Sequence, residues 1–155
     1  MKLFLMRHSD ATGGADDNLR SLSEKGVEQS RKIGNFLKNV GIVFDAAFSS
    51  PLLRAKQTAE IVVSFTNKEP LNVVVTDALL NEASQKEFSR FLNDLLAYEN
   101  VLLVGHSPSI EARLSFLLGI ASPDSIKFAK AAVACIETSD GMTGSLLFFV
   151  NPKIL

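Results

Sequence analysis

In the segment Lys2-Leu3-Phe4-Leu5-Met6-Arg7-His8 an apolar run ends at two basic residues. Such a short apolar run is typical of a strand that is buried on both faces. Residues 101–105, Val-Leu-Leu-Val-Gly, repeat the pattern and are followed by His106. His8 and His106 are the only histidines of the chain. Ligands collect beyond the carboxyl ends of parallel strands, so both imidazoles are expected to share one crevice.

Outside these two runs, short β-rich segments alternate with longer helical patterns, which is typical of a mainly parallel sheet covered by helices. Strands are expected at residues 2–7, 45–49, 73–76 and 101–105, and helices at residues 23–39, 51–65, 84–96 and 108–118. Residues 131–138 and 145–150 flank Asp140-Gly141, a pair that favours a β-hairpin. We therefore expect one three-layer α/β domain over residues 1–155, with a mainly parallel central sheet, an antiparallel edge and helices on both faces.

Composition excludes several classes of function. The net charge is −1, and no cluster of Lys and Arg favours nucleic acid or an anionic membrane surface. No stretch approaches the roughly 20 apolar residues of a membrane span, and residues 1–6 are too short for a signal peptide. The one cysteine, Cys135, has apolar neighbours and is expected to be a buried thiol. These features predict a soluble cytoplasmic protein with no nucleic-acid or membrane partner.

Two predicted helices begin with the same kind of sequence, Ser49-Ser50-Pro51 and His106-Ser107-Pro108. Serine is a favoured N-cap and proline fits the first helical position, so Ser50 and Ser107 are expected to cap these helices. Free amides and the positive end of each helix dipole would then face the crevice, which suits phosphate. With Ser50 as the cap, Arg54 is the fourth helical residue, and its guanidinium can reach back toward the anion.

A single arginine or histidine at a strand end is more often structural than functional. Here, however, Arg7, His8, Arg54 and His106 are all expected at the ends of three strands, and the combination favours an anion site. The sequence has no dense group of carboxylates, cysteines or histidines that would hold a metal ion. We therefore expect a phosphate site that uses neither a metal nor a cofactor.

Several segments resemble a known family. Arg7-His8-Ser9-Asp10-Ala11 resembles the Arg-His-Gly signature of the histidine phosphatase superfamily, also called the phosphoglycerate-mutase-like group. Residues 49–60 are similar to its specific second motif, residues 104–108 to its third, and residues 20–26 to the Leu-Thr-x-x-Gly region that opens the first helix. The short chain without long insertions looks most like the SixA-type phosphohistidine phosphatases.

The resemblance implies roles for the four core residues. His8 would be the nucleophile that is transiently phosphorylated, while Arg7, Arg54 and His106 would bind the phosphoryl group. The implied activity is a metal-independent phosphatase that acts on phosphohistidine of a protein. Its partners would be that phosphorylated protein, or a small phosphate ester, and inorganic phosphate. Such chemistry needs mainly alignment and charge neutralisation, which fixed guanidiniums supply.

Three further residues have open roles. Ser9 stands where most family members carry glycine, and its hydroxyl would either donate to phosphate or cap the turn. Arg20 would either hold the substrate or be a surface charge. Glu82 would either protonate a leaving group or be a solvated loop residue. An alkoxide leaving group needs such an acid, whereas the nitrogen of phosphohistidine can arrive protonated.

Two alternative functions follow from these open roles. One is a small-molecule phosphomonoesterase that uses Glu82 as its general acid. The other is a noncatalytic phosphate-sensing module that keeps the pocket without turnover. Mutase activity is less expected, because a short open domain has little structure with which to retain and reorient an intermediate.

Overall fold

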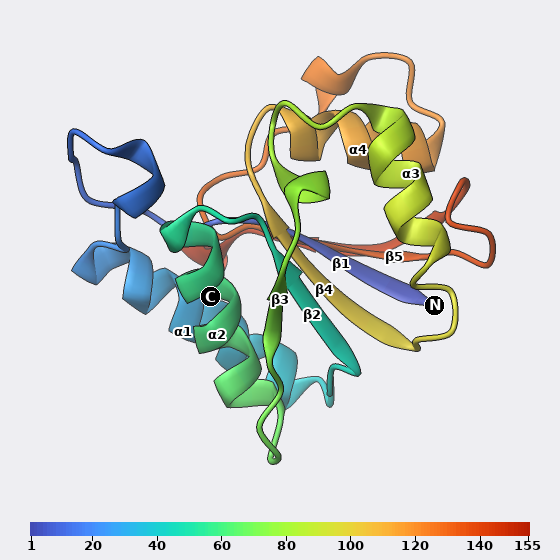
Figure 1. Ribbon diagram of the computed structural model, residues 1–155. Helices are drawn as coiled ribbons and strands as arrows, with labels where there is room; N and C mark the ends of the chain where they lie inside the picture. The colour runs from blue at the N-terminus through green and yellow to red at the C-terminus, as the bar shows by residue number, and fades with distance from the viewer.

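A six-stranded sheet in the order β3-β2-β4-β1-β5-β6 forms the centre of the protein, shown in Figure 1 as a computed structural model that describes residues 1–155. The strands are β1 (Lys2–Arg7), β2 (Ala46–Ser49), β3 (Val73–Val75), β4 (Asn100–Gly105), β5 (Val133–Glu137) and β6 (Ser145–Val150). The first four strands in chain order are parallel to one another, and β5 and β6 pair antiparallel at one edge. The predicted mainly parallel sheet with an antiparallel edge is confirmed.

Helices cover both faces of this sheet, with α1 and α2 on one face and α3 and α4 on the other (Figure 1). The α-helices are α1 (Glu24–Asn39), α2 (Leu53–Thr66), α3 (Gln85–Asn93) and α4 (Ser109–Leu118). Short 3-10 turns are η1 (Asp17–Leu19), η2 (Asp77–Leu79), η3 (Pro123–Ser125) and η4 (Pro152–Ile154). The three-layer α/β architecture is therefore as expected.

The central strand β1 shows why the apolar run lacks alternation. Leu3 and Leu5 pack in the core beneath α3 and α4, whereas Phe4 and Met6 pack in the core beneath α1 and α2. All four side chains are fully buried. Successive side chains of a strand point to opposite faces, so a strand covered on both sides needs apolar residues at every position.

Local signals explain several helix ends. Ser23 caps α1 by accepting from the Gly26 N–H, and Gly41 follows α1 with a φ of 79°. Ser84 and Glu87 form the predicted capping box of α3. Gly119 ends α4 in the left-handed conformation. Gly26 has a further role, because a Cβ there would collide with the backbone of Asp10 in the loop after β1.

Other predicted boundaries are wrong by a few residues. The helices α2 and α4 begin at Leu53 and Ser109, after the prolines rather than at them. Helix α3 ends at Asn93, although Leu95 beyond its end still packs in the core. The β5–β6 connection spans residues 138–144, in which the Asp140 carboxylate accepts from two backbone amides. The buried state of Cys135 is confirmed.

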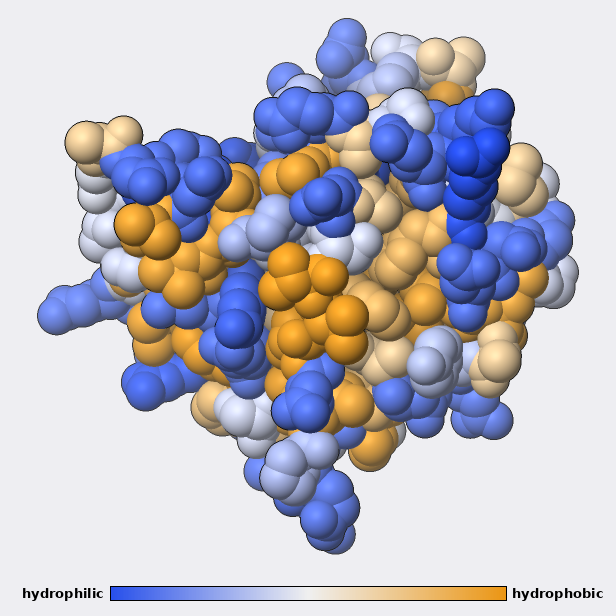
Figure 2. All heavy atoms as spheres, in the orientation of Figure 1, coloured by the Kyte–Doolittle hydropathy of each residue, from blue (hydrophilic) through white to orange (hydrophobic).

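The edge strand β3 leaves part of the surface apolar. Figure 2 shows hydrophobic surface over β3, where Val74 and Val75 are both exposed. Exposed single hydrophobic residues of this kind are ordinary on a protein surface. None of the helices has the length and apolar character needed to cross a membrane.

Candidate active site

The carboxyl ends of β1 and β4 bring the two histidines together. His8 directly follows β1, His106 directly follows β4, and these two strands are parallel neighbours. The ring centroids of the two imidazoles lie 5.0 Å apart. Arg54, in the first turn of α2, donates from Nε to Nε2 of His8 at 3.3 Å. The expected proximity of the two imidazoles is confirmed, and Arg54 lies beside them.

The hydrogen bonds of His8 define which ring nitrogen carries the proton. Nδ1 lies 2.7 Å from the backbone oxygen of Ser9. A carbonyl oxygen only accepts, so Nδ1 carries the proton and Nε2 presents a lone pair, as the bond from Arg54 also requires. Burial, followed by the positive charge of Lys130, lowers the pKa of His8 to about 3. His8 is therefore a neutral imidazole whose Nε2 lone pair points toward Arg54.

His106 is held by a hydroxyl group. Its Nε2 lies 2.5 Å from Oγ of Ser50, and the same Oγ accepts from the backbone N–H of Leu52 at 3.3 Å. Burial, followed by the charge of Arg54, lowers the pKa of His106 to about 4. The prediction that Ser50 caps α2 is wrong. Its hydroxyl is engaged with His106, and Leu52 takes the cap position without a side-chain bond.

The start of α4 also departs from expectation. Ser107 does not cap it, because its hydroxyl donates to Oε1 of Glu111 at 2.9 Å. The N–H of Ser109 donates to Oδ1 of Asn81, at 3.2 Å, instead of being free. The predicted phosphate-binding amides at this helix start are therefore not all free.

Arg54 is fixed by the loop that follows β1. Its Nη1 donates to the backbone oxygen of Asp17 at 2.8 Å, and its Nη2 lies 3.2 Å from the Asp17 carboxylate. Because both terminal nitrogens are held there, Nε is directed at His8. The second helical position of Arg54, rather than the predicted fourth, gives it this reach.

Arg20 contacts the same loop, at Asp17 and Thr12. Its Nη1 lies 3.0 Å from the Asp17 carboxylate, and its Nε donates to the Thr12 oxygen at 2.7 Å. Hydrogen bonds from Arg20 and then Arg54 lower the pKa of Asp17. Arg20 therefore supports Arg54 through Asp17. The sequence gives no signal for this role of Asp17, because Asp17 looks like any other loop carboxylate.

Arg7 and Ser9 flank His8. Arg7 donates from Nη1 to the Phe128 oxygen at 2.7 Å, while its buried Nε has no hydrogen-bond partner. Ser9 points elsewhere. Ser30 donates its own proton to the Gly26 oxygen, so the 2.7 Å contact between the two hydroxyls is a bond from Ser9 to Ser30. The structure gives no support to the predicted contact of the Ser9 hydroxyl with phosphate.

A pocket of about 310 Å³ opens beside these groups. It is lined by Asp17, Asn18, Leu52, Arg54, Leu80, Asn81, Glu82 and His106. Glu82 is exposed at its rim and lines the same pocket as His106 and Arg54. Asn81 bridges to the residues after His106 by donating to the Ser107 oxygen at 3.0 Å. The pocket is thus open to solvent on the side that carries Glu82.

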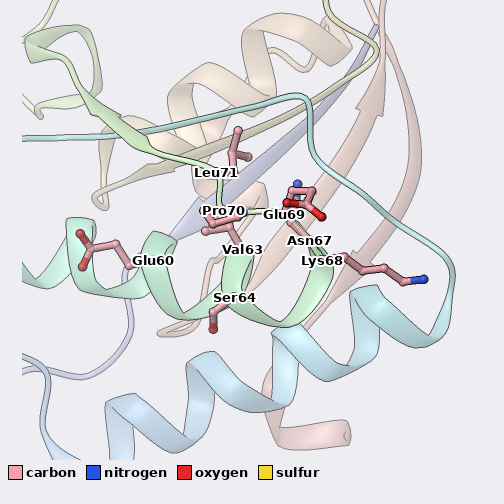
Figure 3. Close-up of a pocket in the computed structure, with 8 residues that line it drawn as sticks. All are labelled: Glu60, Val63, Ser64, Asn67, Lys68, Glu69, Pro70 and Leu71. Carbon is pink, nitrogen blue, oxygen red and sulfur yellow. The ribbon is translucent and has the colours of Figure 1, made fainter.

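Figure 3 shows a different pocket, between the end of α2 and the segment that leads to β3. It is lined by Glu60, Val63, Ser64, Asn67, Lys68, Glu69, Pro70 and Leu71. None of the predicted site residues lies there. Its one cation, Lys68, lies beside Glu69 in sequence, and no histidine is available, so it lacks the groups that phosphoryl transfer requires.

The two histidines predict a loss of stability in mild acid. Their pKa values lie below the ordinary 6.5 in the folded protein, so the unfolded chain binds more protons once the pH falls below 6.5. At about pH 5 the free energy of unfolding should drop by about 2 kcal/mol for each histidine. Urea unfolding in phosphate-free buffer at several pH values measures this. A flat profile between pH 7 and 5 would contradict it, and His106→Asn should remove about half of the slope.

Comparisons with known proteins agree with this geometry. Residues 3–90 match the histidine phosphatase superfamily (branch 1). Over 155 residues the chain is 28% identical to the phosphohistidine phosphatase SixA of Escherichia coli, covering 98% of this chain and 94% of the relative. A 2,3-bisphosphoglycerate-dependent phosphoglycerate mutase of Rhizobium etli is 35% identical over 77 residues, which are 46% of this chain and 37% of the relative.

Solved structures extend the likeness to the whole fold. The structure of the protein histidine phosphatase SixA complexed with tungstate has a TM-score of 0.91 at 28% identity and covers 99% of both chains. The alpha-ribazole phosphatase of Shigella flexneri shares the fold, with a TM-score of 0.77 at 20% identity over 98% of this chain and 97% of that one. This chain belongs to branch 1 of the histidine phosphatase superfamily and is a phosphatase.

Proposed function

We propose that the protein removes the phosphoryl group from phosphohistidine on a protein, through a phosphohistidine intermediate on His8 and without a metal ion. One observation carries the proposal. The Nε2 lone pair of His8 faces the Arg54 guanidinium, while its Nδ1 proton is held by the Ser9 oxygen. A phosphoryl group placed between Nε2 and Arg54 would meet a neutral nucleophile and a fixed cation.

The reaction has two displacements at phosphorus. In the first, Nε2 of His8 forms a bond to phosphorus as the bond from phosphorus to the substrate nitrogen breaks, and the protonated imidazole departs neutral. In the second, water attacks phosphorus, the bond to Nε2 breaks and returns its electron pair to His8, and orthophosphate and a proton leave. The guanidiniums of Arg7 and Arg54 neutralise the phosphoryl oxygens in both steps, and the neutral imidazole of His106 lines the same site. The two guanidiniums would repel a divalent metal ion from the same place.

A protein-borne substrate fits the open rim. Asp17 retains 61% side-chain exposure, and Asn18, Asn81 and Glu82 are exposed around the mouth of the pocket. A histidine on a protein surface could enter the pocket between these exposed residues and approach Arg54 and His106, which line it. The relatives named SixA, a phosphohistidine phosphatase and a protein histidine phosphatase, support the same substrate class.

A small-molecule phosphomonoesterase is the second candidate, because Glu82 lines the pocket with His106 and Arg54. An ester releases an alkoxide, which needs a proton from an acid, and Glu82 lies in the pocket where it could supply one. General acid catalysis of this kind contributes about 10²- to 10⁴-fold. Phosphohistidine does not need it, since its leaving nitrogen can be protonated beforehand.

A kinetic panel tests the proposal. The protein should hydrolyse a phosphohistidine peptide at least about 10²-fold more efficiently than glycerol phosphate or a sugar phosphate, and Glu82→Gln should leave the peptide reaction nearly unchanged. Glu99→Gln is the matched control, because Glu99 is an exposed carboxylate immediately before β4, at the opposite end of the strand from His106. High turnover of the esters that Glu82→Gln abolishes, with none on the peptide, would establish the second candidate instead.

A further inference from the structure

The segment between η3 and β5 is fixed against the nucleophile by several bonds. The Phe128 oxygen accepts from Nη1 of Arg7 at 2.7 Å, and the Phe128 N–H donates to Oε1 of Glu111 at 3.2 Å. The Phe128 ring is buried and packs edge-on against Phe149. Two residues later comes Lys130, which no motif includes.

Ala131 fixes the other side of Lys130. Its N–H donates to the backbone oxygen of His8 at 3.3 Å, and its φ is 63°, in the left-handed region. A residue with a Cβ adopts this conformation at a cost, and such strain gathers at functional sites. Lys130 is therefore carried by backbone that is bonded directly to the nucleophilic residue.

Lys130 lies in an unbalanced cluster of charges. Its side chain is half-buried, and none of the ion pairs of the structure includes it. Burial, and then the charges of Arg7, Arg54 and Arg20, lower the pKa of Lys130, and the single carboxylate that raises it is that of Asp10. Like charges gathered at a partly buried place are unfavourable unless an anion joins them.

We propose that the Lys130 ammonium binds the phosphoryl oxygens of the substrate at His8, as a further catalytic residue beside Arg7 and Arg54. The proposal rests on the function proposed above and adds a binding group that lies outside the family motifs. The effect of Lys130 on His8 agrees with it, since Lys130 is the charged group that most lowers the pKa of His8. An ammonium that bonds the phosphoryl oxygens would stabilise the dianion, and its charge would keep the nucleophile neutral.

Binding of tungstate and of orthophosphate to the full chain, measured by calorimetry, tests this inference. Lys130→Met should weaken both by about 10-fold or more, as expected for a lost charge-assisted hydrogen bond, and should lower kcat/KM on the phosphohistidine peptide by at least as much. Lys130→Arg, which keeps the charge, should recover part of the affinity. Lys127→Met is the matched control, because Lys127 is an exposed lysine of the same segment, and should stay within about twofold of the unmodified protein.

The outcomes separate this inference from the proposed function. If Lys130→Met binds tungstate within twofold of the unmodified protein, the inference is overturned even where the peptide is a good substrate. If tungstate binding depends on Lys130 but the peptide is not hydrolysed, the substrate proposal fails and the binding role holds. A protein that binds neither anion would overturn both.

Discussion

His8→Ala should abolish turnover of every phosphorylated substrate, with a loss on the order of 10⁴-fold or more, as expected when a covalent nucleophile is removed. His106 cannot take over, because its Nε2 is bonded to Ser50. The unmodified protein should become labelled when it is mixed with a radiolabelled phosphohistidine peptide and quenched within milliseconds. The quench must be alkaline detergent, since acid hydrolyses a phosphorus–nitrogen bond. His8→Ala should carry no label.

A binding measurement separates lost chemistry from lost structure in this variant. His8→Ala keeps Arg7 and Arg54, so it should still bind tungstate, and its unfolding should remain cooperative. Label on His8→Ala at the level of the unmodified protein would place the nucleophile elsewhere. Tungstate binding by the unmodified protein, with neither label nor turnover, would support the noncatalytic phosphate-sensing module instead.

The sheet and the paired histidines could be predicted from the sequence because they depend on short-range pattern. β1 and β4 are apolar at nearly every position, and only strands covered on both faces carry such runs. Parallel strands of one sheet end at the same edge, so His8 and His106 had to come close if β1 and β4 were neighbours. The apolar pattern does not by itself determine that β1 and β4 are adjacent in the sheet.

Side-chain partners across long separations could not be predicted in the same way. Ser50 is a good cap by local preference, yet a histidine 56 residues away takes its hydroxyl. Tertiary hydrogen bonds outweigh a capping preference of about 1 kcal/mol when the competing partner is buried. The roles of Asp17 and Lys130 could not be predicted for a related reason. A loop residue shows no periodicity from which the direction of its side chain could be inferred.

Arg54→Met should lower kcat on the phosphohistidine peptide by about 10²- to 10³-fold, the loss typical of removing one fixed donor to a developing charge. Arg54→Lys should recover only a small part. A lysine keeps the charge but cannot bond Asp17 through two terminal nitrogens while it directs a third donor at Nε2 of His8. Lys56→Met is the matched control, because Lys56 is an exposed cation of the same helix that pairs with Glu60 at 3.8 Å.

Proton NMR titration shows whether Arg54 acts through charge at this site, since the chain has only two histidines and each gives a separate imidazole signal. Arg54 is the leading charged neighbour that lowers the pKa of His106, whereas for His8 it ranks behind Lys130 and His106. Arg54→Met should therefore raise the pKa of His106 more than that of His8. If neither pKa moves while activity falls, the guanidinium does not face the imidazoles. The loss would then have to come from a displaced η1 loop, which Asp17→Asn would reproduce.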